Sequence, residues 1–139
     1  MNDLTHRLAP AAAMLGRVML VAIFLIEGWS KISFYAPSAA YMDKFGVPGL
    51  LLPAAIAIEI GGALLIAIGW QTRLAALALA VFCVVVAVLF HGALAPKNTA
   101  LHFWKDIAIA GGFLLLFAHG PGPWSLDERQ NAGRSQAST

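Results

Sequence analysis

The sequence predicts an all-α protein, a four-helix bundle that spans a membrane. Hydrophobic residues make up 60% of the 139 residues and charged residues only 12%, with a mean hydropathy of +0.77. A soluble domain normally carries about 25% charged residues. A soluble chain of this size could not bury so much apolar surface, because small domains leave much of their chain at the surface. The better solvent for this composition is a lipid bilayer.

Four long apolar segments supply the predicted helices. Each is close to the roughly 20 residues that an α-helix needs to cross about 30 Å of hydrocarbon. Each must be helical, because in lipid every backbone polar group has to be hydrogen-bonded internally. Together they form a single transmembrane domain over residues 1–126. The predicted helices cover residues 14–34, 50–70, 74–95 and 100–119.

The connections between the helices differ in length. The tight turn at Gln71–Arg73 makes the second and third helices antiparallel neighbours. The longest connection contains residues 38–45, which are predicted to form one or two turns of interfacial helix. Gly120–Pro123 ends the fourth helix. Residues 127–139 are polar and rich in small residues, so they are predicted to be a disordered cytoplasmic tail.

An even number of crossings places both termini on one side of the membrane. Five arginines fall on that side, and Lys44 and Lys97 are the basic residues of the loops on the other. The positive-inside rule therefore predicts cytoplasmic termini. The positive charges are scattered singly, so no nucleic-acid partner is expected. Cys83 is the single cysteine, which excludes a dithiol mechanism carried by this chain alone.

Ionisable side chains from all four predicted helices fall in one layer, in the outer half of the membrane. Glu59 is the deepest, roughly 13 Å from the outer end of its helix at 1.5 Å per residue. A charge near the bilayer centre costs at least ~2.5–3.5 kcal/mol, so such residues usually face inward, pair with one another and mark function. The layer consists of Glu27, Lys31, Glu59, His91, His102, Lys105 and Asp106.

These residues predict a ligand or proton site. The candidate catalytic residues, which would donate hydrogen bonds or relay protons, are Glu59, Glu27, Lys31 and His91. The candidate ligand-binding residues are Lys105, Asp106 and His102, with Trp29, Phe103 and Trp104 lining an apolar slot. Burial is expected to favour the protonated form of Glu59, although a nearby lysine would oppose this. The alternative is a structural network whose lysines reach towards the interface. No metal-binding spacing is present.

The chain resembles the DoxX family of small four-helix bacterial membrane proteins, from Arg17 to Asp127. The resemblance rests on short motifs in a fixed order. They are Arg17, Phe24 and Gly28-x-x-Lys31; Glu59-x-Gly61-Gly62; Gly69-x-x-Thr72-Arg73-x-Ala75-Ala76; His91; Phe103-x-Lys105 and Gly111-Gly112; and Gly120-Pro121-Gly122-x-x-Ser125-Leu126-Asp127. Glu27 stands where relatives often have a small polar residue.

The resemblance implies a multi-pass protein of the bacterial plasma (inner) membrane. Namesake relatives are subunits of a membrane thiosulfate:quinone oxidoreductase, and others associate with oxidative-stress and sulfur-handling enzymes. We therefore expect a membrane subunit with a quinone or small-anion site, no covalently bound cofactor and a redox partner protein. Two alternatives remain open at this point. One is a small proton-coupled transporter with Glu59 as proton carrier, and the other is a non-catalytic assembly subunit of a larger membrane complex.

Overall fold

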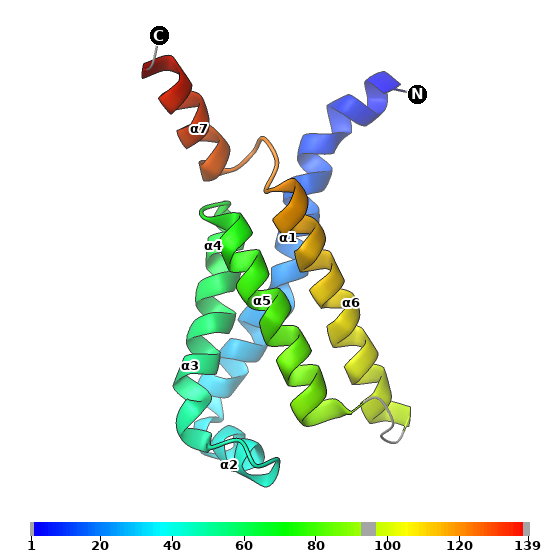
Figure 1. Ribbon diagram of the computed structural model, residues 1–139, viewed down its shortest axis with the longest axis vertical. Helices are drawn as coiled ribbons and strands as arrows, with labels where there is room; N and C mark the ends of the chain where they lie inside the picture. The colour runs from blue at the N-terminus through cyan, green and yellow to red at the C-terminus, as the bar shows by residue number, and fades with distance from the viewer. Residues whose placement is uncertain (1, 93–96, 138–139) are drawn as a thin grey trace.

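The computed structural model describes residues 2–92 and 97–137, apart from the side chains of residues 2, 3, 5, 97, 136 and 137. Within these residues the chain is helical and contains no strand, and it forms four long helical rods (Figure 1). In chain order the rods are α1 (Asn2–Ser33); η1 (Gly49–Leu51), α3 (Leu52–Ile56), η2 (Ala57–Gly61) and α4 (Gly62–Ile68); α5 (Thr72–Val86) and η3 (Ala87–His91); and α6 (Lys97–His119).

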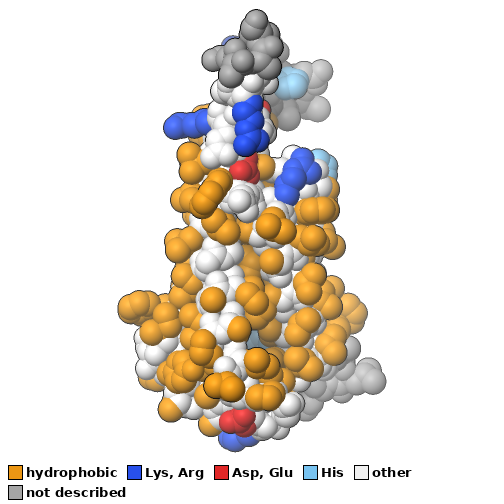
Figure 2. Space-filling view, turned by 60° about the vertical axis from the view of Figure 1, so that its left-hand side comes forward, with side chains coloured by type: hydrophobic (Ala, Val, Ile, Leu, Met, Phe, Trp, Pro, Cys, Tyr) orange, Lys and Arg blue, Asp and Glu red, His pale blue; other side chains and the backbone are white. Residues whose placement is uncertain are grey.

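Each rod contains a segment long and apolar enough to cross a membrane. The four segments are His6–Ser33, Gly49–Ile68, Thr72–His91 and Asn98–His119. In the space-filling view the middle of the visible face is almost entirely hydrophobic, and the Lys and Arg side chains lie towards its two ends (Figure 2). Such an apolar belt is what a bilayer requires of the surface it covers. The predicted all-α transmembrane bundle is therefore confirmed.

The helix limits differ from the prediction mainly at the N-terminus. The first helix begins at Asn2 instead of residue 14, because a search for apolar runs finds only the part that lies in lipid. Pro10 lies inside this helix. The third rod ends at His91, and residues 93–95 of its predicted range lie outside the described residues.

The chain reverses direction between rods at two opposite ends of the bundle. We call the end that carries the start of α1 and all of α7 (Leu126–Ala137) the terminal end, and the opposite end, which carries α2 (Tyr35–Lys44), the loop end (Figure 1). The interfacial helix expected in the longest connection is α2 (Tyr35–Lys44), which is longer than predicted. Tyr41 and Phe45 of this segment pack against Phe90 of η3, with ring centroids 5.8 and 5.3 Å apart.

The tail is helical where the structure describes it. The prediction of a disordered segment from residue 127 is wrong for α7 (Leu126–Ala137). Ser125 Oγ accepts a hydrogen bond from the backbone N–H of Glu128 at 3.3 Å, which caps the helix start. The composition suggested disorder, but Ser125 and Glu128 have the S-x-x-E spacing of a capping box. That local signal was present in the sequence.

The hydrophobic core fills the terminal half of the bundle. Phe113, Leu79 and Ile66 are fully buried, and the rings of Phe24 and Phe113 meet edge to face at 5.3 Å. Each paired-glycine motif contributes one residue to packing. A Cβ at Gly62 would lie 3.0 Å from Leu79 Cγ, whereas Gly61 faces open space. The absent side chain therefore lets neighbouring helices approach closely.

Arg17 ties the terminal end together. The residue is 4% exposed, and its guanidinium donates hydrogen bonds to the carbonyl oxygens of Pro121 at 2.6 Å and Trp124 at 2.9 Å. A longer contact of 3.4 Å reaches Ala67 O. A planar guanidinium can serve several acceptors at once, which an ammonium cannot do in the same geometry. The arginine thereby fixes the α6–α7 connection on α1 and α4.

Asp127 completes this attachment. Its carboxylate accepts the backbone N–H of Gln71 at 2.7 Å and of Thr72 at 2.9 Å, and its own N–H donates to Gly69 O at 2.8 Å. The carboxylate thus caps the N-terminus of α5 from the far end of the chain. Gly69 has φ +74°, and a Cβ there would lie 2.5 Å from Ser125 Cβ. Only glycine meets both conditions without strain.

Candidate functional site

Two π-helical segments, η2 and η3, carry Glu59 and His91. A π segment widens one turn by an extra residue, and such bulges occur frequently at functional sites. η2 lies at the middle of its rod, and η3 lies at the loop end of its rod. The apolar sequence around Glu59 and His91 gives no warning of the changed register, because its hydrophobicity is nearly continuous. The π geometry was therefore not predicted.

The first polar group joins α1 to η2. Lys31 Nζ lies 2.9 Å from Glu59 Oε1 and 3.7 Å from Glu27 Oε2. Glu59 is 4% exposed, whereas the Glu27 side chain is 57% exposed. Glu59 Oε2 is buried without a hydrogen-bond partner among the described residues. Since buried polar atoms are almost always hydrogen-bonded, this oxygen is an exception, an acceptor that the described residues leave unused.

The second polar group joins η3 to α6. His91 Nδ1 lies 2.8 Å from Asp106 Oδ2, and Lys105 Nζ lies 3.7 Å from Asp106 Oδ1. Lys105 Nζ also lies 3.4 Å from His102 Nδ1, and the rings of His91 and His102 are 5.3 Å apart. Asp106 is nearly buried, and its two oxygens face two different bases. This arrangement can hold or pass on a proton.

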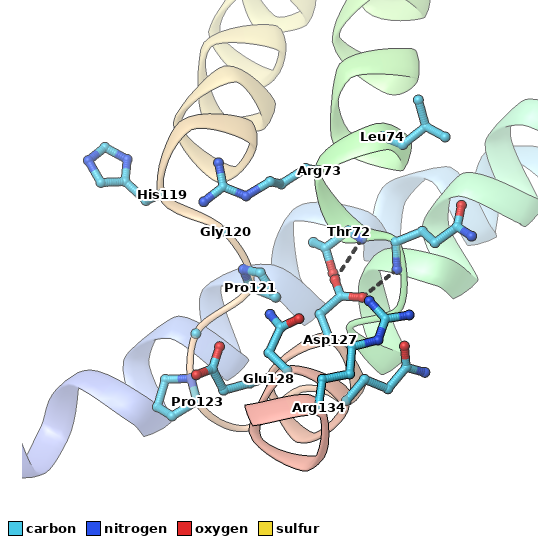
Figure 3. A pocket seen from close by; sticks show the side chains of 14 residues that line it. Thr72, Arg73, Leu74, His119, Gly120, Pro121, Pro123, Asp127, Glu128 and Arg134 are labelled. Carbon is cyan, nitrogen blue, oxygen red and sulfur yellow. Dashed lines mark hydrogen bonds between the residues drawn. The ribbon is translucent and has the colours of Figure 1, made fainter. Parts of the chain in front are cut away.

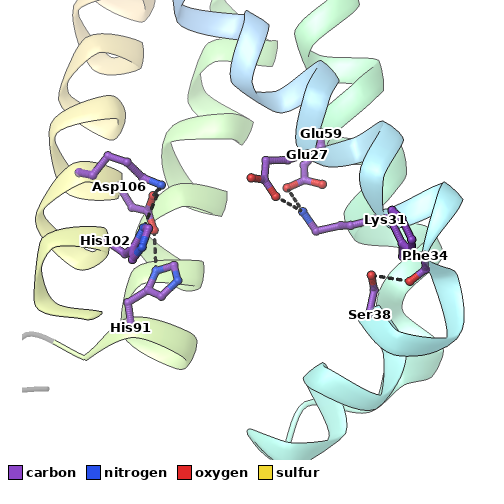
Figure 4. Close-up of polar contacts among 9 residues, drawn as sticks. Glu27, Lys31, Phe34, Ser38, Glu59, His91, His102 and Asp106 are labelled. Atoms are coloured by element: carbon purple, nitrogen blue, oxygen red, sulfur yellow. Dashed lines mark hydrogen bonds and ion pairs between the residues drawn. The ribbon is translucent and has the colours of Figure 1, made fainter. Parts of the chain in front are cut away.

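Both groups line one cavity of about 220 Å³. Figure 4 shows them on opposite sides of it, with Lys31 and Glu59 on one side and His91 and Asp106 on the other. The structure thus brings together all the ionisable residues of the predicted layer, while their roles stay a prediction. The cavity is lined by Ile23, Phe24, Glu27, Lys31, Glu59, Phe82, Cys83, Val86, His91, His102, Lys105, Asp106 and Ile109.

The three aromatic residues expected in the slot do not line this cavity. Trp29 is 68% exposed and Trp104 is 59% exposed, and Phe103 packs edge to face against Trp104. Trp29 follows Glu27 by two residues, which is about 200° around an α-helix, so it points away. These aromatic residues are close in sequence to the charged residues, but their positions around the helix place them on other faces.

Apolar lining residues were missed by the sequence analysis, although helix phase could have found some of them. Ile23 and Phe24 precede Glu27 by four and three residues, and Ile109 follows Asp106 by three. These spacings place them on the same helix faces as the charges. The lining residues Cys83 and Phe82 could not be found in this way, because the π segment changes the register between them and His91.

A larger cavity of about 610 Å³ lies at the terminal end, between the α4–α5 turn, the end of α6 and α7 (Figure 3). Its main charged groups already serve the fold. Arg73 donates to the carbonyl oxygens of Phe117 and Ala118, and Asp127 accepts the N–H groups of Gln71 and Thr72. The smaller cavity is therefore the better candidate site, because its ionisable residues lie within the membrane-spanning segments.

The fold and this cavity define a polytopic membrane protein whose four rods all contribute residues to one charged cavity. The DoxX family model matches residues 12–92, more than half of the chain. The chain belongs to the DoxX family, as the sequence motifs indicated.

Two relatives come from Escherichia coli (strain K12). The chain is 41% identical to the inner membrane protein YqjF over 125 residues, which cover 90% of this chain and 96% of the relative. It is 36% identical to the inner membrane protein YphA over 129 residues, which cover 86% of this chain and 91% of the relative. No solved structure matches.

Proposed function

We propose that this DoxX-family protein resides in the bacterial inner membrane and binds the head group of a quinone in its charged cavity, beside a redox partner protein. One observation carries the proposal. Hydrogen-bond donors stand on opposite sides of one small cavity, and a buried carboxylate oxygen without a described partner lies close to one of them. The names of the two bacterial relatives support the location. The ligand class is supported only by the resemblance of the sequence motifs to a family that has quinone-linked members.

The donor set fits a quinone. A quinone ring is flat and carries two carbonyl oxygens at opposite edges, so it needs a donor at each edge. Lys31 stands on one wall and His91 on the other (Figure 4), and Lys105 lies 3.7 Å from Asp106 beside His91. Phe24, Phe82 and Ile109 supply apolar surface for the ring faces. Pockets that hold drug-sized ligands are typically about 300–1,000 Å³, so about 220 Å³ suits a ring-sized head group alone.

The reduced form of the ligand would use the same residues differently. A quinone, when bound, supplies two-electron carrier chemistry, and its reduced form has hydroxyl groups that donate hydrogen bonds. Glu59 lines the cavity and its carboxylate can accept such a bond, while Lys31 holds Oε1 at 2.9 Å. His91 and Asp106 can take up or release a proton on the other wall. Cys83 is the single cysteine, so the electrons would come from the partner protein.

Co-purification and titration test this proposal. The full-length protein, purified from bacterial membranes in a mild detergent, should carry extractable quinone and should bind added quinone. Glu59→Gln keeps the shape and polarity of a protonated carboxyl group. It should therefore preserve folding and membrane insertion but lose the proton uptake or release that accompanies quinone binding. Glu128→Gln, on the exposed α7, is the matched control. Wild-type protein that binds no quinone would overturn the proposal.

A second candidate function is proton-coupled transport of a small weak acid. The observation that favours it is the exposure of His102 and Lys105, which line the cavity and leave it a polar side beyond the buried Glu59. Glu59 would then carry the proton. Uptake of a weak acid by proteoliposomes, abolished by Glu59→Gln, would support this function. Purification only together with fixed partners, without uptake or quinone, would instead indicate an assembly subunit.

A further inference from the structure

The wall of the bundle between α1 and α6 is closed only in the terminal half. There, a Cβ at Gly112 would lie 3.2 Å from Leu20 Cδ1, and the rings of Phe24 and Phe113 meet at 5.3 Å. Towards the loop end, α1 packs against η2 and α3, whereas α6 packs against α5 and η3. The two helices therefore diverge, and the charged cavity lies beyond the point where they part (Figure 1).

The open side of the cavity lies within the depth of the membrane. Ile23 and Ile109 both line the cavity and are only half-buried. Ile109 is in the middle of the span Asn98–His119. Ile23 precedes the end of α1 at Ser33 by about 15 Å at 1.5 Å per residue. The exposed part of each side chain lies at bilayer depth, and the two residues come from the two helices that part here. This supports an opening of the cavity sideways, between α1 and α6.

The rim of this opening is polar. Glu27 lies one turn beyond Ile23 and its side chain is 57% exposed, and the Lys105 side chain on α6 is 43% exposed. Charged side chains within a membrane normally face a bundle interior or pair with other groups, because exposure to hydrocarbon is unfavourable. Here Glu27 has Lys31 as its partner and Lys105 has Asp106, each at 3.7 Å. The gap is thus bordered by an acid on one helix and a base on the other, which a polar head entering the cavity can contact.

We propose that the gap between α1 and α6 is a lateral portal, through which a tailed amphiphile dissolved in the bilayer places its head in the charged cavity. This inference rests on the proposed quinone-head site and adds the class of ligand and its route. The cavity volume of about 220 Å³ holds a ring-sized head and leaves no room for a long tail. The tail stays in the portal between Ile23 and Ile109, and Glu27 and Lys105 contact the head as it enters.

Spin-label accessibility tests the portal without reference to any activity. A nitroxide is attached at Ile109→Cys in a Cys83→Ala background, in vesicles of phosphatidylethanolamine and phosphatidylglycerol. The control is Leu114→Cys, which is 50% exposed on the same helix and does not line the cavity. A portal predicts that both labels collide readily with oxygen, which concentrates in lipid, and rarely with a water-soluble nickel chelate. Dominant collision with the chelate at residue 109, or with neither reagent, overturns the portal.

A second experiment, with added quinone, distinguishes failure of the portal from failure of the proposed function. Adding an alkyl-tailed benzoquinone should lower oxygen collision and label mobility at residue 109 but not at residue 114, whereas the tail-less benzoquinone should leave both labels unchanged. Binding of the tailed quinone without any change at residue 109 overturns the portal. If wild-type protein binds neither quinone, the proposed function fails, while the collision data still decide the portal. Ile23→Cys, with the 74% exposed Met19→Cys as its control, repeats the test on α1.

Discussion

Lys31 Nζ lies 2.9 Å from Glu59 Oε1 and 3.7 Å from Glu27 Oε2, so one ammonium group serves two carboxylates of very different exposure. Glu27 and Lys31 are four residues apart on one helix, a spacing that places them on the same face. The structure gives the shorter contact to Glu59, which comes from another rod. The pair therefore fastens α1 to the π segment η2.

This relationship predicts unequal couplings. Lys31→Met leaves the buried Glu59 carboxylate without its partner. Breaking a buried pair in this way lowers the free energy of unfolding by on the order of 3–5 kcal/mol. The same change in a Glu59→Gln background should cost much less, since no buried charge is left unpaired. The parallel cycle with Glu27→Gln should show a smaller coupling, because the Glu27 side chain is 57% exposed. Reversible unfolding in mixed detergent micelles measures both cycles. Additive losses in the Lys31–Glu59 cycle would contradict the interaction.

Arg17 should be required for stability at the terminal end. Arg17→Ala removes a guanidinium that donates to Pro121 O and Trp124 O. Hydrogen bonds of charged groups contribute about 1.5–3 kcal/mol each, so a loss of several kcal/mol is expected. Arg17→Lys should recover only part of it, because an ammonium lacks the planar fork. Arg7, which is exposed on the same helix, is the control, and Arg7→Ala should change little. Equal effects at the two positions would refute this role.

Asp127 should make the stability of the fold depend on pH in the acidic range. Partial burial acts to raise the pKa of Asp127, but the N–H donors of Thr72 and Gln71 and the charge of Arg17 outweigh it and hold that pKa below its ordinary value of 3.8. A depressed folded-state pKa stabilises the fold above the unfolded-state pKa, and that contribution is lost as the pH falls through the folded-state pKa.

The wild-type protein should therefore lose stability as the pH falls through 3.8 and below. Asp127→Asn should be less stable near neutral pH and should lack this part of the acid dependence. Thermal unfolding between neutral pH and strong acid measures the difference. Glu128→Gln changes the neighbouring carboxylate, which makes no such contact with the α5 N-terminus, and it should keep the wild-type profile. An unchanged acid profile in Asp127→Asn would show that another group is responsible.

The orientation in the membrane is a separate prediction. The arginines of the terminal end place both termini in the cytoplasm by the positive-inside rule. In a Cys83→Ala background, Lys44→Cys at the end of α2 should react with a membrane-impermeant thiol reagent in spheroplasts. Gln130→Cys in α7 should react only after the membrane is permeabilised. The reverse pattern would invert the topology, and it would move the charged cavity to the cytoplasmic half of the bilayer.

Much of the architecture followed from the sequence because lipid restricts the choices. Residues 14–34, for example, are apolar over a membrane thickness, and in lipid such a segment has to be a helix. The depth of Glu59 and the ionisable residues of the other three helices were enough to predict a polar layer, because charges in lipid usually pair with one another. The α7 helix was not predicted, because the polar composition of residues 127–139 is typical of disorder, although Ser125 and Glu128 have the spacing of a capping box.

The sequence by itself determined the membrane-spanning helices, the layer of charges and the family, because each depends on residue type and on position along the chain. Only the tertiary structure decided which charges meet. Lys31 reaches Glu59 and His91 reaches Asp106 across different rods, and two π segments set the register in which they do so. It also decided that Trp29 points away from the cavity, that Arg17 binds carbonyl oxygens contributed by residues at the far end of the chain, and that α1 and α6 part beside the cavity. The physical reason is that contacts between helices depend on phase and crossing geometry, and a nearly continuous apolar sequence encodes neither in its local pattern.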